Sequence, residues 1–243
     1  MSINYIIPCW DGDRHQGMDR YFEKDRGIYV RTQIHQFTHI ERHLDQITFV
    51  KCANSPENPL FVSTLNNLPS KINNTNIEVI TTNLDGWSYG AFAEAYEKYR
   101  TNFDYYVFCE DDYTVVMDNF DEFLISALES CPKCGYACSL EHKDNGVSFG
   151  TVSNGVIRST ALEANRAYHG GLVSHFNQVD FGHGFWRSGW EVCSLCPKIR
   201  APYWAGLEIE PWRGIVIPHC KEGEIDLWVP IQLVLQSTRI PLK

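Results

Sequence analysis

Three adjacent acidic residues, Glu110-Asp111-Asp112, directly follow a short apolar run, Tyr105-Tyr106-Val107-Phe108-Cys109. Neighbouring carboxylates repel one another, so such a cluster needs something that offsets its charge. A divalent cation is the simplest partner, because oxygen ligands suit Mg²⁺ or Mn²⁺, ions that proteins usually share with substrate phosphates. The alternative is a solvated acidic turn without a ligand. The apolar run is typical of a strand covered on both faces, and this position favours the metal site.

The first half of the chain alternates predicted strands and helices. We expect strands over 3–8, 46–52, 77–82 and 105–109, and helices over 26–44, 59–68 and about 89–100. This alternation predicts an α/β fold with a parallel sheet and crossover helices. Ligands bind such sheets at the carboxyl ends of the strands, which is where the acidic cluster is expected to lie.

The second half is less regular. A helix is expected near 119–130 with Asp118 as its N-cap, followed by a strand near 135–141. After residue 150 the hydrophobic periodicity weakens, and five of the seven tryptophans lie beyond residue 185. We therefore expect one continuous domain whose regular half, 1–115, adjoins a loop-rich half, 116–243, with an aromatic binding surface.

Composition excludes several classes of protein. The chain has 243 residues and a formal net charge of −9 without a basic run, which argues against nucleic acid as a partner. No apolar run approaches the roughly 18 residues of a membrane span. The first residues, Met1–Pro8, lack the basic segment and long apolar core of a secretion signal, so we expect a cytoplasmic protein. Neither a P-loop motif nor a GxGxxG dinucleotide motif is present.

Nine cysteines are present, and four of them form two CxxC pairs, Cys131/Cys134 and Cys193/Cys196. Four thiolates are able to hold a structural zinc ion. The 58 residues between the pairs exceed the spacing of a zinc ribbon, so reduced thiols near the ends of secondary-structure elements are the favoured interpretation.

Three segments together resemble the family-2-type glycosyltransferases with the GT-A fold. Ile6-Ile7-Pro8-Cys9-Trp10-Asp11-Gly12 resembles the end of their first strand, and Asn83-Leu84-Asp85-Gly86-Trp87-Ser88 resembles their Asn/Gly segment. Tyr106–Asp112 is similar to their DxD-type strand end, in a Glu-Asp-Asp version. The resemblance covers about residues 1–115, and the basic residue often found after the Asn/Gly segment is missing.

The resemblance implies a GT-A-like fold, a nucleotide-sugar donor bound by the first half, an acceptor bound by the second half, and a Mn²⁺ or Mg²⁺ ion. Asp112 would be the direct metal ligand, and His219 a further ligand from the C-terminal region. The other residues implied to line the donor site are Pro8, Trp10, Asp11, Asn54, Asn83, Gly86, Ser88, Glu110 and Asp111.

An inverting transferase also needs a carboxylate that accepts the proton of the attacking hydroxyl. Two candidates lie in the second half, Glu191 in Gly189-Trp190-Glu191 and Asp180 in Val179-Asp180-Phe181-Gly182. Glu191 is preferred because Gly-Trp-Glu resembles the segment that carries the base in several GT-A families. Aromatic planes suit the apolar faces of sugars, so Trp186, Trp190 and Trp212 are expected to contact the acceptor.

The sequence thus predicts a metal-dependent glycosyltransferase that uses a nucleotide-sugar, with UDP as the expected nucleotide, in polysaccharide or glycan synthesis. Two alternatives stay open. One is a nucleotide-sugar-binding scaffold of the same fold without transfer activity. The other is a metal-dependent phosphohydrolase or nuclease that uses the acidic cluster; the charge of −9 argues against a nuclease.

Overall fold

The computed structural model describes residues 1–10, 27–52, 58–83, 87–138, 141–144, 146–150, 154–171, 178–195 and 228–231. The first half contains β1 (Ile3–Cys9), α1 (Gly27–His39), β2 (Gln46–Cys52), α2 (Pro59–Asn66), β3 (Lys71–Ile72), β4 (Thr75–Thr82), α3 (Trp87–Tyr99), η2 (Arg100–Asn102), β5 (Tyr105–Cys109) and β6 (Tyr113–Val115). The second half contains α4 (Phe120–Glu129), β7 (Cys134–Cys138), β8 (Glu141–Asp144), β9 (Val147–Gly150), β10 (Asn154–Arg158), α5 (Ser159–His169), α6 (Gln178–Arg187), β11 (Glu191–Ser194) and β12 (Trp228–Pro230).

The main sheet has eight strands in the order β11-β7-β10-β5-β1-β2-β4-β3. Strand β1 pairs in parallel with β2 and β5, and β2 pairs in parallel with β4. Strand β10 is antiparallel to both β5 and β7, and β3 is antiparallel to β4. The expected α/β class with a mostly parallel sheet is therefore confirmed.

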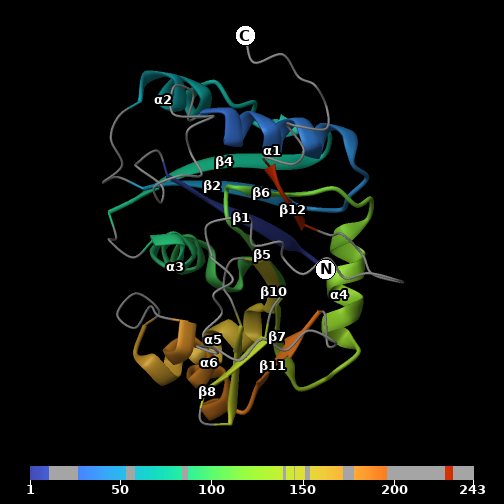
Figure 1. The fold of residues 1–243 in the computed structure, drawn as a ribbon, viewed down its shortest axis with the longest axis vertical. Helices are drawn as coiled ribbons and strands as arrows, with labels where there is room; N and C mark the ends of the chain where they lie inside the picture. Colours follow the sequence, from blue (N-terminus) through green and yellow to red (C-terminus); the bar gives the residue numbers. More distant parts are fainter. Residues whose placement is uncertain are drawn as a thin grey trace, which may run out of the picture.

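Helices cover both faces of this sheet (Figure 1). Helices α1, α2 and α4 pack on one face, where Phe37, Phe61 and Phe120 are fully buried. Helices α3 and α5 pack on the other face together with α6, where Phe92, Leu162 and Phe185 are buried. Burial on both faces explains why β1 is apolar without alternation, since every one of its residues is buried.

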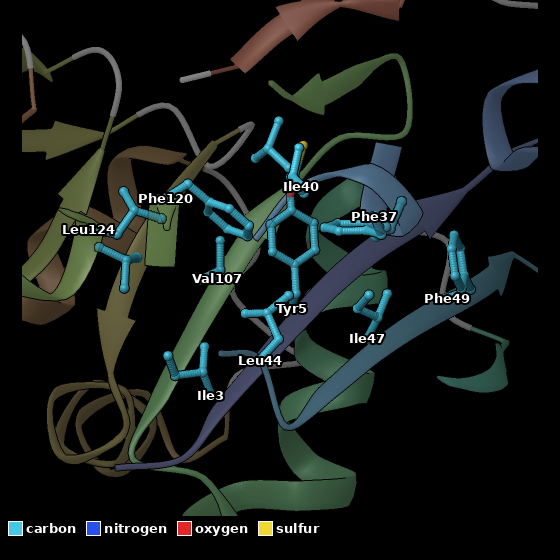
Figure 2. Close-up of a cluster of buried hydrophobic side chains, with 14 of the residues drawn as sticks. Ile3, Tyr5, Phe37, Ile40, Leu44, Ile47, Phe49, Val107, Phe120 and Leu124 are labelled. Carbon is cyan, nitrogen blue, oxygen red and sulfur yellow. The ribbon is translucent and has the colours of Figure 1, made fainter. Parts of the chain in front are cut away.

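Tyr5 stands at the centre of the first core (Figure 2). Its ring makes edge-to-face contacts with Phe37 at 5.1 Å and with Phe120 at 5.7 Å between centroids. The three rings come from β1, α1 and α4, so this cluster joins the two halves of the chain. Strands β1 and β5, which lead to the acidic cluster, are thereby held on a rigid base.

Several predicted boundaries differ from the observed ones. Helix α1 ends at His39 rather than near 44, because the Arg42 guanidinium donates to the carbonyls of Phe37 and Ile40 and so satisfies the end of the helix. The N-cap of α4 is Asn119 and not Asp118, whose carboxylate instead accepts a hydrogen bond from Glu41 N at 2.7 Å.

Regular structure also continues beyond residue 150, where the periodicity weakens. Strand β10, helices α5 and α6 and strand β11 lie within the described residues of this region. Helix α6 contains two glycines, and one of them, Gly184, lies where a Cβ would meet the Asn165 side chain at 2.3 Å. Helix α6 thus approaches α5 closely at Gly184, while its apolar side chains Phe181 and Phe185 are buried in the second core. None of the described helices combines the length and apolarity of a bilayer-crossing segment.

Truncating Phe120 tests the role of the shared core. We expect Phe120→Ala to lower the free energy of unfolding by about 3–5 kcal/mol, because it leaves a cavity beside Tyr5. Urea denaturation measures this change. The control Leu60→Ala, at a side chain that is 51% exposed, should cost about 0.5 kcal/mol or less. A loss under about 1 kcal/mol for Phe120→Ala would show that the two halves do not depend on this cluster.

Candidate functional site

The carboxyl ends of β1, β2, β4 and β5 lie at one edge of the sheet, because these strands are mutually parallel. Trp10, Asn83 and Glu110 follow directly on β1, β4 and β5, so the structure brings these predicted residues to that edge. Pro8 lies buried near the end of β1, whereas Trp10 is 37% exposed and Asn83 is exposed. The other predicted residues Asp11, Asn54, Gly86, Trp212 and His219 lie outside the described residues.

Glu110, Asp111 and Asp112 form a turn between β5 and β6, here called the acidic turn. The Asp111 carboxylate accepts a hydrogen bond from the backbone N–H of Trp10 at 3.2 Å. This side chain is only 5% exposed. Asp111 therefore ties the end of β1 to the end of β5, which is a positioning role.

Glu110 lies beside the start of α3. The Ser88 hydroxyl, in the first turn of that helix, donates to Glu110 Oε1 at 2.7 Å. A carboxylate near a helix N-terminus is favourable, because the helix dipole is positive there. This contact alone would explain Glu110 as a structural residue. It also places Ser88, one of the residues expected in the donor site, against the acidic turn.

Asp112 is half-buried and leads into β6. Its carbonyl accepts a hydrogen bond from Ile231 N at 2.8 Å, just after β12, the strand that pairs with β6. On the next residue, the Tyr113 carbonyl accepts from the Gln33 side chain of α1. The acidic turn is thus fixed by β1, α3, α1 and the short β6–β12 ribbon.

The donor set of the acidic turn suits a hard divalent cation. Among the described residues, no three side chains of His, Cys, Asp or Glu converge to hold a metal ion by themselves. Mg²⁺ and Mn²⁺ in phosphate-binding sites are commonly held by one or two carboxylates, with substrate phosphates and water completing the shell. The acidic turn fits a site of that kind and not an all-protein cage.

Asp180, one of the two candidate bases, lies in the first turn of α6. Helix α5 starts at the amino edge of the sheet, where Ser159 N donates to the Asp104 carbonyl just before β5. At the other end of α5, His169 Nε2 donates to the Asp180 carbonyl at 3.1 Å. Asp180 therefore lies where the start of α6 packs on the end of α5.

Glu191, the preferred candidate, lies at the opposite edge. It is the first residue of β11 and pairs with Cys134, the first residue of β7. At the carboxyl edge, Cys138 of β7 pairs with Gly155, whose neighbour Asn154 pairs with Cys109. Four residues of strand separate Cys134 from Cys138, which is about 13 Å. The exposed Glu191 is thus displaced from the acidic turn along the strands and by three strands across the sheet.

Two of the predicted acceptor residues also lie away from the acidic turn. Trp186 is 57% exposed near the end of α6, and its ring lies beneath the Arg187 guanidinium at 5.8 Å. Trp190 directly precedes β11 and packs beside Gly135 at the start of β7. The structure brings neither tryptophan to the acidic turn.

One further residue at the edge of the acidic turn was not predicted from the sequence. Asn154 is the first residue of β10 and pairs with Cys109, so its fully buried side chain lies beside the acidic turn. It follows a polar loop-like segment in the region of weak periodicity. No feature of the sequence marks it, because its position depends on an antiparallel strand inserted between two parallel ones.

Three of the four CxxC cysteines lie near one another, without the convergence among the described residues that a metal site needs. The Cys193 thiol interacts with the thiols of Cys134 and Cys131, and all three are free cysteines. The fourth member, Cys196, lies outside the described residues. Hydrogen bonding to Cys134 and burial both raise the pKa of the Cys193 thiol well above its usual value.

Comparisons with known proteins support the fold. No protein-family model matches the sequence, and no curated protein matches it significantly. Solved structures of other proteins resemble the chain at very low sequence identity, and two of them illustrate the similarity. A mannosyltransferase, PcManGT from Pyrobaculum calidifontis in complex with GDP-Man and Mn²⁺, is 9% identical with a TM-score of 0.55, over 83% of this chain and 56% of that one. The chain thus spans little more than half the length of that protein.

The second structure is a 4-diphosphocytidyl-2C-methyl-D-erythritol synthase from Anaerococcus prevotii DSM 20548. It is 11% identical with a TM-score of 0.50, over 82% of this chain and 90% of that one. Both similarities concern the whole arrangement of sheet and helices. They show that the chain has the GT-A-like, Rossmann-like fold found among proteins that handle nucleotides and sugars.

The thiol pKa values lead to a labelling prediction. Burial also raises the pKa of the Cys109 thiol, with smaller contributions from the neighbouring carboxylates. Because only the thiolate reacts with iodoacetamide, Cys109 and Cys193 should stay protonated and unlabelled at pH 8 in the folded protein. Peptide mass spectrometry after native labelling checks this, with urea-unfolded protein as the control. Labelling of Cys193 at the unfolded rate would contradict the cluster geometry.

Proposed function

We propose that this protein is a metal-dependent glycosyltransferase that transfers a sugar from a nucleotide-sugar, with UDP as the nucleotide, to a hydroxyl group of a glycan. The observation that carries this proposal is the meeting of Trp10, Ser88 and the acidic turn at one edge of a GT-A-like sheet. Two hydrogen bonds, from Trp10 N to Asp111 and from Ser88 to Glu110, hold this arrangement. Open α/β sheets bind their ligands at this edge.

The donor half supplies positioning and charge. Asp112 is proposed to hold a Mn²⁺ or Mg²⁺ ion, with His219 as a further candidate ligand. When bound, such an ion neutralises the charge that develops on the departing diphosphate. Asp111 and Glu110 keep the turn in place, while Trp10 offers an exposed ring and Asn83 an amide near the nucleoside. Asp11, Asn54, Gly86, Ser88 and Pro8 complete the proposed donor surface. The structurally similar mannosyltransferase, solved with GDP-Man and Mn²⁺, supports the choice of a nucleotide-sugar and a divalent cation as ligands.

The acceptor hydroxyl must lose a proton as it attacks the sugar, and an inverting enzyme assigns this to a carboxylate within hydrogen-bond reach. We favour Asp180 over Glu191 for this role, because Glu191 begins β11 at the edge opposite the acidic turn. By the same argument Trp186 and Trp190 suit a remote part of a long glycan, while Trp212, which lies outside the described residues, stays an acceptor-site candidate.

The two alternatives make different predictions about binding and turnover. A non-catalytic scaffold would bind the nucleotide-sugar without consuming it. A phosphohydrolase would release phosphate from nucleotides without a sugar acceptor. No contact in the structure favours either one over transfer.

Replacing Asp112 tests the metal assignment. Isothermal titration with UDP, with and without Mn²⁺, should show metal-dependent binding by the wild-type protein. We expect Asp112→Asn to weaken that binding by tenfold or more, since the amide removes the charge that attracts the cation. The control Glu122→Gln, at an exposed carboxylate on α4, should bind as the wild type does. Equal affinity in Asp112→Asn would refute the assignment.

The edge argument makes a second prediction. In a transfer assay, Asp180→Asn should lower kcat by about 10²–10⁴-fold with little change in donor affinity, the range typical of a general base. Glu191→Gln should retain kcat within about threefold, because it lies at the opposite edge. The reverse result would restore Glu191 as the base. Full activity in both variants would favour a retaining reaction.

A further inference from the structure

Asn154 is an unusual residue beside the acidic turn. It is fully buried, yet neither Nδ2 nor Oδ1 of its side chain has a hydrogen-bond partner among the described residues. Buried amides are nearly always paired, because each unpaired polar atom costs on the order of 1–3 kcal/mol. Two other buried amides each keep one paired atom: Asn4 Oδ1 accepts from Thr48 at 2.9 Å, and Asn165 Nδ2 donates to Phe181 O at 2.8 Å, whereas Asn154 has none among the described residues. Asn154 therefore carries a cost that calls for a compensating function.

The strand register places Asn154 against the acidic turn. Residues directly opposite in an antiparallel pair project from the same face of a sheet, so the side chains of Asn154 and Cys109 are neighbours. The Cys109 thiol donates to the carbonyls of Glu110 at 3.3 Å and Tyr113 at 3.6 Å. These two residues open and close the turn. Asn154 thus lies next to Cys109, the side chain whose thiol contacts both ends of the acidic turn.

We infer that Asn154 is a positioning residue for the cation-bound form of the acidic turn. In this form its Nδ2 group donates to a carboxylate oxygen of the turn and orients the other oxygen toward the ion. Carboxylates that hold a metal are commonly oriented by such a hydrogen bond. The unpaired amide raises the free energy of the ligand-free form and gains its partner when the ion and diphosphate bind. This inference rests on the proposed function, because it assumes that the turn holds a cation.

The test uses a substitution of similar size without polar atoms, Asn154→Leu. Replacing unpaired polar atoms by apolar ones is neutral or stabilising, so the melting temperature without ligand should stay the same or rise. The affinity for UDP in the presence of Mn²⁺, and for Mn²⁺ in the presence of UDP, should fall on the order of tenfold. Asn154→Ser retains a donor and should lose less affinity than Asn154→Leu.

Asn165→Leu is the matched control, because Asn165 is equally buried but its Nδ2 group donates to Phe181 O. It should lower the melting temperature and leave the affinity unchanged, the opposite of Asn154→Leu. An affinity of Asn154→Leu within twofold of the wild type would overturn the inference. So would a fall in its melting temperature as large as that of Asn165→Leu, because Asn154 would then be structural. Failure of the wild type itself to bind UDP with Mn²⁺ would instead refute the proposed function, and this inference with it.

Discussion

The hydrogen bond from Trp10 N to the buried Asp111 carboxylate is the constraint on which the rest of the site depends. It joins the end of β1 to the end of β5, the two central strands of the sheet. With Asp111 fixed in this way, Glu110 accepts from Ser88 of α3, and the Asp112 carbonyl accepts from Ile231 N after β12. One carboxylate is therefore used for structure, and it holds in place the next one, to which we assign the cation. The repulsion within the triplet is offset in part by the N–H and hydroxyl donors of this framework.

The shared aromatic core makes such precision possible. Tyr5 packs against Phe37 and Phe120, and these contacts hold β1 between helices from both halves of the chain. On the other face, Phe92 of α3 stacks on Phe108 of β5 at 4.2 Å between centroids. This stack lies two residues before Glu110 and sets the position of α3, and hence of Ser88. Aromatic packing in the two cores therefore helps to fix the positions of the acidic turn and Ser88 at the carboxyl edge of the sheet.

Local patterns in the sequence were sufficient for most strands of the first half. Strands β2 and β5 have the predicted bounds, because their apolar runs end at clear turn residues, and the resemblance placed Trp10, Ser88 and the acidic turn together. The second half required topology that no local pattern contains. Strand β10 runs antiparallel between β5 and β7, which brings Asn154 to the edge of the acidic turn and leaves Glu191 at the other. The local sequence Gly-Trp-Glu is the same whichever edge of the sheet it occupies. Only the strand directions show that Glu191 lies at the edge opposite the acidic turn.

The central claim is that the acidic turn binds a divalent cation together with a diphosphate. Crystals grown with UDP and Mn²⁺, with diffraction recorded at the manganese absorption edge, test it most directly. The account predicts an anomalous peak within coordination distance of an Asp112 carboxylate oxygen and of the diphosphate. A peak bound elsewhere, or nucleotide bound at this edge without manganese, would contradict it.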